Sequence, residues 1–375
     1  MSQWSNARNI LCVRLDNMGS VLMTTPAMRA LKQAVPERCL TLLASPAGAA
    51  VAGYLPEVDR VVTYDAPWLK GANTRDVTAD RRLISRLDAA DHDAAVIFTA
   101  RGESALPAAL LCMMADIPLR LAHSVENPYL LLTDWVRDEE PDSTDGMRHE
   151  VQRQLDLVAS IGASTEDQQL SFALCDADRS ALLPKLGRRG VDLHRPWLVL
   201  HPGAVSGSHD DAFEQYLATV KGIRSQLDCQ VLLTGSEQEI PICRALQDSV
   251  GRGTTSLAGE LSLGEFGALI AGSAVLLSNG SASVHIAAAV GTPVVDLQAR
   301  MQSEQTPWQV PNRVLDTSSC SDDTHASGQA GFDPRHLVSA VCELWQEHGG
   351  RRACFSMSAP GGAAAGGNFT AADAA

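Results

Sequence analysis

The stretch "ILCVRLDNMGSVLMTTPAMRALK", residues 10–32, sets the pattern that the rest of the chain repeats. Its first six residues form an apolar run that is broken only by Arg14, and a glycine turn follows at once. Beyond the turn, apolar residues recur every three to four positions, which is the period of one helix face. Pro26 either starts this helix or kinks it. The stretch therefore predicts a strand that runs through a turn into a helix.

The same alternation continues along both halves of the chain. Near-continuous apolar strands that alternate with helical segments predict parallel sheets covered on both faces. A chain of 375 residues is too long for one small core, so we expect two doubly wound units. The other predicted strands lie in the segments 39–45, 58–65, 94–100, 197–204, 229–236, 274–281 and 293–298.

Three regions follow from this pattern. We predict an N-terminal Rossmann-like domain over residues 1–175 and a C-terminal one over residues 176–350, which ends in a helix at 337–345. Residues 351–375 are rich in alanine and glycine and carry almost no charge, so we expect this tail to be disordered.

The charge and composition of the chain exclude several classes of protein. A formal net charge of -14 argues against nucleic-acid binding and against a surface that docks on anionic lipid. Neither a signal peptide nor an apolar run of 18 residues is found, so we predict no membrane span. The nine cysteines are scattered without a CxxC pair, which is typical of reduced thiols in the cytoplasm.

Four predicted strand ends carry glycine turns, with the sequences "NMGS", "HPGA", "TGSE" and "SNGS". Free backbone N–H groups at such turns bind phosphates, although one tight turn alone is no sign of function. Three of the turns lie in the second half at carboxyl ends of strands, where open parallel sheets bind ligands. Neither GxGxxG followed by an acid nor GxxxxGK[ST] is present, which disfavours a dinucleotide dehydrogenase and a P-loop kinase.

Two histidines stand near these turns. His285 lies one turn into the helix after "SNGS" and is suited to donate to a phosphate, unless the backbone satisfies it. His209 precedes Asp210 and Asp211, a set that either binds a metal or places two acids at a helix N-terminus. We favour the second reading and expect no metal. In the first half, Arg101 and Arg120 suit bidentate capture of a carboxylate or phosphate, and surface solvation is the alternative.

Seven segments, in order over residues 9–345, resemble glycosyltransferase family 9, the lipopolysaccharide heptosyltransferases. They are "ILCVRLDNMGSVLMTTPAMRALK", "LPEVDRVVTYD", "IPLRLAH", "WLVLHPGA", "VLLTGSEQE", "SLAGELSLGEFGALI" and "SNGSASVHIAAAVGTPVV". The resemblance implies an α/β protein of GT-B architecture, with two Rossmann-like domains whose parallel sheets face a central cleft. It also implies inverting, metal-independent transfer of a heptose from ADP-heptose to a lipid-linked lipopolysaccharide-core acceptor, without a cofactor. The protein would be cytoplasmic, with transient contact to the inner membrane.

The resemblance also assigns site residues. The acceptor side would include Gly19, Arg101 and Arg120, and either Glu237 or Glu239 would bind the ribose hydroxyls of the donor. The remaining donor-side residues would be Gly203, Ala204, His209, Gly280, Ser281, Ala282 and His285.

The chain departs from the family pattern at three ligand-facing positions. Ser20 stands where the family has the aspartate that deprotonates the acceptor hydroxyl, and serine is a very weak base. Asp16 in the same loop is a candidate to replace it, and is equally suited to capping the turn. His209 stands for a lysine and Gly280 for an aspartate. Ser20 and Asp16 are therefore the catalytic candidates.

These departures leave three readings of the function open. The first is a glycosyltransferase whose activity is weak or lost because Ser20 replaces the base. The second is a non-catalytic relative that binds a sugar nucleotide or glycan, or acts as a partner protein. The third is a different α/β enzyme such as an epimerase, because fold alone does not decide function.

Overall fold

The computed structural model describes residues 3–69, 76–138, 147–203, 209–280, 282–298, 303–316 and 332–349. The tail 351–375, for which disorder is predicted, lies outside the described residues.

The first sheet is built from six parallel strands in the order β3-β2-β1-β4-β5-β6. Four of its strands match predicted apolar runs, whereas β5 and β6 were not predicted. The strands are β1 (Asn9–Arg14), β2 (Cys39–Ala44), β3 (Arg60–Thr63), β4 (Ala94–Ile97), β5 (Leu119–Ser124) and β6 (Asp134–Arg137).

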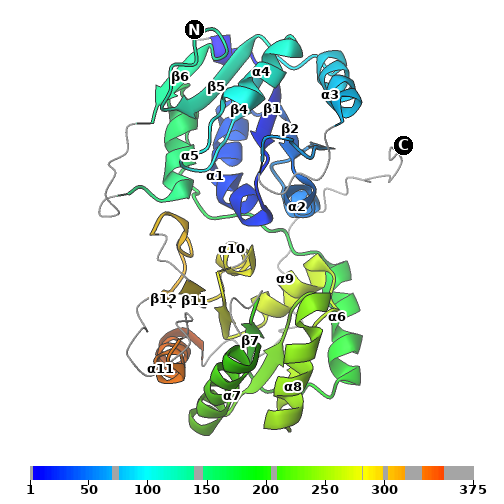
Figure 1. The fold of residues 1–375 in the computed structure, drawn as a ribbon, viewed down its shortest axis with the longest axis vertical. Helices are drawn as coiled ribbons and strands as arrows, with labels where there is room; N and C mark the ends of the chain where they lie inside the picture. The colour runs from blue at the N-terminus through cyan, green and yellow to red at the C-terminus, as the bar shows by residue number, and fades with distance from the viewer. Residues whose placement is uncertain are drawn as a thin grey trace.

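Helices cover both faces of this sheet (Figure 1). Ile10 and Cys12 of β1 belong to one apolar cluster with α1 and α5, whereas Leu11 and Val13 belong to another with α3 and α4. Alternate residues of a strand point to opposite faces, so every position of β1 must be apolar except where a partner compensates a charge. The helices are α1 (Met18–Ala34), α2 (Pro46–Ala49), α3 (Val77–Ala89), α4 (Leu106–Met114) and α5 (Glu150–Ala159), with 3-10 turns η1 (Gln3–Ser5) and η2 (Ala52–Tyr54).

Helix α1 begins before its proline. Asn17 is its N-cap, and the Asn17 side chain accepts a hydrogen bond of 3.0 Å from the backbone N–H of Ser20. Pro26 lies inside the helix and is buried. The alternative in which Pro26 starts the helix is therefore wrong.

The second sheet repeats the first, with six parallel strands in the order β12-β11-β10-β7-β8-β9. Helices α9 and α10 cover one face and α7 and α11 the other. The strands are β7 (Trp197–His201), β8 (Gln230–Leu233), β9 (Thr254–Ser256), β10 (Val275–Ser278), β11 (Val294–Gln298) and β12 (Asn312–Asp316). The helices are α6 (Asp176–Arg188), α7 (His209–Gln226), α8 (Ile240–Val250), α9 (Leu263–Ala271), α10 (Ala282–Ala289) and α11 (Pro334–Leu344), with η3 (Glu237–Glu239), η4 (Ser303–Gln305) and η6 (Trp345–Gly349).

The two halves meet along α1 and α10, which lie between the sheets (Figure 1). Trp308 of the second half donates a hydrogen bond of 2.7 Å to the carbonyl of Gln168 in the first. Helix α6 packs against α9 of the second half. Two doubly wound units, as predicted, are present, and a boundary near residue 175 stays a prediction.

Candidate active site

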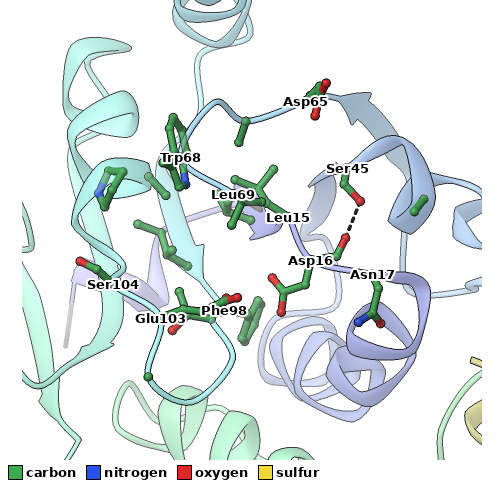
Figure 2. A pocket seen from close by; sticks show the side chains of 18 of the residues that line it. Leu15, Asp16, Asn17, Ser45, Asp65, Trp68, Leu69, Phe98, Glu103 and Ser104 are labelled. Atoms are coloured by element: carbon green, nitrogen blue, oxygen red, sulfur yellow. Dashed lines mark hydrogen bonds between the residues drawn. The ribbon is translucent and has the colours of Figure 1, made fainter. Parts of the chain in front are cut away.

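A hollow of about 910 Å³ opens at the carboxyl edge of the first sheet (Figure 2). Its walls come from the ends of β1 and β4, the start of α2 and the segment after β3. In the strand order of this sheet, β1 and β4 are neighbours from which the chain winds in opposite directions. Open α/β sheets bind ligands at such a switch point, and the volume is that of a small-molecule site.

Asp16, directly after β1, is a partly exposed carboxylate in the wall of the hollow. Its Oδ2 lies 2.9 Å from Nη2 of Arg14, and the Ser45 hydroxyl donates to its backbone carbonyl. Figure 2 shows Asp16 and Trp68 on opposite sides of the hollow, with Leu15 and Leu69 between them. Asp16 is thus held by two partners and still open to a ligand.

Arg14 is the charge that interrupts the apolar strand, and it is completely buried. Its guanidinium lies between Asp16 and Glu150, with Nη1 2.9 Å from Oε1 of Glu150. Burial lowers the pKa of Arg14, but the two carboxylates outweigh it and raise the pKa above its ordinary value. Gln154 also donates to Glu150 over 2.6 Å. The ion pairs therefore link the hollow to α5, close to the second half of the chain.

Glu103, in the loop after β4, brings a second carboxylate to the wall. Its Oε2 accepts a hydrogen bond of 3.3 Å from the backbone N–H of Ala100. Partial burial, followed by the negative charge of Asp16, raises the pKa of Glu103. Glu103 therefore takes a proton more readily than an ordinary glutamate. Sequence reasoning gave no role in the site to Glu103 or Trp68.

Ser20 lies in the first turn of α1 and is 5% exposed, and it is not among the residues that form the hollow. Gly19, beside it, faces α10: a Cβ atom at this position would lie 2.7 Å from Cδ2 of His285. Glycine is thus required there by the close approach of the two helices. The assignment of Ser20 to the catalytic site stays a prediction that this position does not favour.

His285 is buried at the same contact, with 7% of its surface exposed. Its Nδ1 has no hydrogen-bond partner among the described residues. Burial, with a smaller effect of His149, lowers the pKa of His285 to about 4. At neutral pH the ring is uncharged, so its predicted contact with a phosphate would be a neutral hydrogen bond.

The glycine turns of the second sheet lie side by side. A Cβ atom on Gly203 would lie 3.4 Å from the carbonyl oxygen of Asn279, and both Gly203 and Gly280 have positive φ angles, +65° and +50°. The Gly280 N–H donates to Asp296 over 3.1 Å. Asp296 is 1% exposed, and its burial raises its pKa to about 6. The predicted Ala204 and Ser281 lie outside the described residues.

The other donor-side residues are placed as follows. Ala282 is the first residue of α10, and Glu237 is exposed at the start of η3. Glu239 is buried, and its carboxylate accepts from the Ser236 N–H over 2.6 Å in a capping box. Of the two acids proposed for the ribose, Glu237 is therefore the one open to a ligand. His209 is the first residue of α7, and its side chain lies outside the described part of the structure.

The two predicted acceptor arginines are in different surroundings. Arg101 lines the hollow, and its Nη1 donates to Sδ of Met147 over 2.7 Å. Arg120, on β5, donates to the backbone carbonyls of Leu130 and Leu131 and of the segment before β5. These bonds tie the β5–β6 connection together, and a contact of Arg120 with the acceptor stays a prediction.

No cluster of three or more His, Cys, Asp or Glu side chains able to hold a metal ion occurs among the described residues. Within the same part of the chain, every helix is too short or too polar to cross a membrane.

Known proteins share both the sequence pattern and the fold. The model of glycosyltransferase family 9 (heptosyltransferase) matches residues 81–330. Lipopolysaccharide heptosyltransferase 3 of Escherichia coli K12 is 25% identical over 288 residues, which are 74% of this chain and 79% of that protein.

Solved structures are similar over most of the chain. The glycosyl transferase family 9 protein of Veillonella parvula has a TM-score of 0.72 at 16% identity, covering 91% of this chain and 98% of its own. An E. coli heptosyltransferase with ADP-2-deoxy-2-fluoro heptose has a TM-score of 0.63 at 18% identity, covering 90% and 99%. These likenesses confirm the expected GT-B architecture.

Proposed function

The chain belongs to glycosyltransferase family 9, and we propose that it transfers a heptose from ADP-heptose to a hydroxyl of a lipid-linked glycan, with inversion and without a metal. The acceptor would be the lipopolysaccharide core or a related glycan, met at the cytoplasmic face of the inner membrane. The observation that carries the proposal is the Asp16 carboxylate, which is oriented by Arg14 and lies in the hollow at the switch point of the first sheet.

Asp16 would act as the general base. An acceptor hydroxyl bound in the hollow gives its proton to Asp16 while its oxygen attacks the anomeric carbon of the donor. The bond between that carbon and the diphosphate breaks, and ADP leaves with the bonding electron pair. The ion pair with Arg14 keeps the carboxylate from turning away. A weak base at Ser20 is then no obstacle, because a carboxylate stands earlier in the same loop.

The turns of the second sheet would bind the donor. Backbone N–H groups at turns and at helix N-termini bind phosphate oxygens without needing a charge. Gly203 and Gly280 allow the two turns to approach each other, and the exposed Glu237 is open to ribose hydroxyls. In support, a similar E. coli heptosyltransferase structure contains an ADP-heptose analogue.

The test is a pair of measurements on the full chain. Calorimetry with ADP reports donor binding, and release of ADP from ADP-heptose in the presence of a lipopolysaccharide-core oligosaccharide reports transfer. NMR of the product gives the anomeric configuration, for which we expect inversion. Micromolar binding of ADP without turnover would favour the non-catalytic alternative, and no binding of ADP would exclude a role in ADP-sugar transfer.

A further inference from the structure

The charges on the wall of the hollow restrict what it can bind. Three carboxylates contribute to its described lining, those of Asp16, Asp65 and Glu103, against one guanidinium, that of Arg101. Arg14 lies behind Asp16 and is itself paired with two carboxylates. Asp65 and Glu103 are exposed, and they therefore meet an incoming ligand directly. An anionic ligand in this hollow would face like charges on several sides.

The apolar part of the wall includes the indole ring of Trp68. Trp68 is half-buried, and its ring lies 5.7 Å from the ring of Tyr64 at an angle of 57°. The Tyr64 hydroxyl donates to Asp80 of α3 over 2.8 Å, which fixes the ring that supports Trp68. Leu15 and Leu69 lie next to Trp68 in the hollow (Figure 2). An indole face of this kind covers the C–H face of a pyranose ring.

The ionised carboxylates of the wall accept hydrogen bonds and donate none. Each ionised carboxylate accepts hydrogen bonds from ligand hydroxyls at two oxygens. The ionised group of a sugar phosphate or a uronate donates no hydrogen bond to these carboxylates. It is also repelled by them, and each unit charge at 4 Å in water weakens the affinity about fivefold. A hydroxyl-rich ring without an anionic group satisfies both features of the hollow.

From this wall we infer that the acceptor sugar bound in the first-sheet hollow carries no phosphate or carboxylate. This inference rests on the proposed function, because it names the class of acceptor for the same site. It differs from the capture of a carboxylate or phosphate for which Arg101 and Arg120 were predicted to be suited. The sugar stacks on Trp68 and donates its hydroxyls to Asp16, Asp65 and Glu103, and one of these donations brings the reacting hydroxyl to the base.

The test compares matched sugars on the full chain in the presence of saturating ADP. The probes are methyl α-mannopyranoside, mannose 6-phosphate and methyl glucuronide, titrated by calorimetry. We expect the neutral glycoside to bind at least tenfold more tightly than either anionic probe. Equal or tighter binding of mannose 6-phosphate or methyl glucuronide would overturn the inference.

Two variants locate the effect. Asp65→Asn removes one exposed charge and weakens one acceptor for both sugars, so it should narrow the preference for the neutral glycoside over mannose 6-phosphate about fivefold. Trp68→Ala should weaken all three probes. Asp248→Asn, an exposed acid on α8, is the matched control and should change nothing. If Asp248→Asn has the same effect as Asp65→Asn, the selectivity comes from net charge and the inference is wrong.

The acceptor inference and the proposed function fail separately. Calorimetry with ADP alone tests the donor side of the proposed transfer. If ADP does not bind but the neutral glycoside is still preferred when titrated alone, the proposed function is wrong and the hollow still selects uncharged sugars. If ADP binds and turnover occurs only with an anionic sugar, the transfer is right and the acceptor class is wrong.

Discussion

The carboxyl edges of the two sheets differ, although the strands of both sheets follow the same order. The edge of the first sheet opens into a hollow of about 910 Å³ whose wall carries Asp16 and Glu103. At the edge of the second sheet two glycine turns approach closely, and one of its carboxylates, that of Asp296, is buried beneath Gly280. One topology thus places a carboxylate in a hollow at one edge and brings backbone turns together at the other. Proton transfer needs the first kind of edge, and binding of a diphosphate is served by the second.

The largest effect should come from the carboxylate of the first edge. Asp16→Asn removes the proposed base and should lower kcat by about 10² to 10⁴. Ser20→Ala should change kcat little, because Ser20 lies in the buried first turn of α1. The measurement is the rate of ADP release at saturating substrates, with thermal unfolding to show that both variants are folded. If Ser20→Ala lowers kcat as much as Asp16→Asn does, the assignment of Asp16 as the base is wrong.

Stability of the same edge should depend on Arg14. Arg14→Met removes the cation beside Asp16 and leaves Glu150 with the more distant Arg153, 3.7 Å away, and breaking a buried ion pair costs about 3–5 kcal/mol. Arg195→Met, at the exposed pair with Asp228, should cost less than about 1 kcal/mol. Urea unfolding at pH 7.5 gives both free energies. Equal costs for the two variants would mean that the buried network contributes nothing beyond a surface pair.

At the second edge, the free energy of unfolding should depend on pH through the buried Asp296. Burial raises the pKa of Asp296 from 3.8 to about 6, so ionisation of Asp296 disfavours the folded state above pH 6. Asp296→Asn should raise the free energy of unfolding at pH 8 by about 3 kcal/mol, and the gain should shrink as the pH falls from 6 to 4. An amide at this position still accepts from the Gly280 N–H. Urea unfolding at pH 8 and pH 4.5 measures the difference, and a gain that does not change with pH would contradict the assignment.

The contact of Gly19 on α1 with His285 on α10 should give the smallest effect. Gly19→Ala forces a Cβ atom against His285 and should cost about 1–3 kcal/mol, because neither helix is free to move away. Gly187→Ala is the matched control, since its Cβ meets nothing within 4 Å in helix α6, and it should stabilise by about 0.5–1 kcal/mol. Thermal unfolding compares the two. Gly19→Ala at wild-type stability would show that α1 and α10 separate easily.

The central strands were predictable because burial on both faces demands an apolar residue at every position. Strand β1 satisfies this rule from Ile10 to Val13, between the partly buried Asn9 and the ion-paired Arg14. The strands that sequence reasoning missed depart from it: β6 and β12 are edge strands that are only partly buried, β9 has three residues, and β5 contains Arg120 and His123. Such short or polar segments carry no pattern that distinguishes them from loops.

Within the site, residues that are close in sequence were predictable and those that are distant were not. Asp16 follows the strand that holds Arg14, so the loop itself pointed to a carboxylate beside the glycine turn. Glu103 and Trp68 reach the hollow from separate loops, and their segments contain no motif that predicts this. The contact between Gly19 and His285 joins the two halves of the chain, which sequence spacing does not show.

The sequence by itself determined the alternation of apolar strands with helices, the two repeated units and the glycine turns, because these depend on local propensity and on burial of each strand. Only the tertiary structure decided which side chain near the start of α1 lines the hollow. Asn17 caps α1, so the helix begins at Met18 and winds Ser20 onto a buried face. Asp16 stays outside the helix, where Arg14 directs it into the hollow. The choice between these two residues thus depends on where a helix begins and on what packs against it.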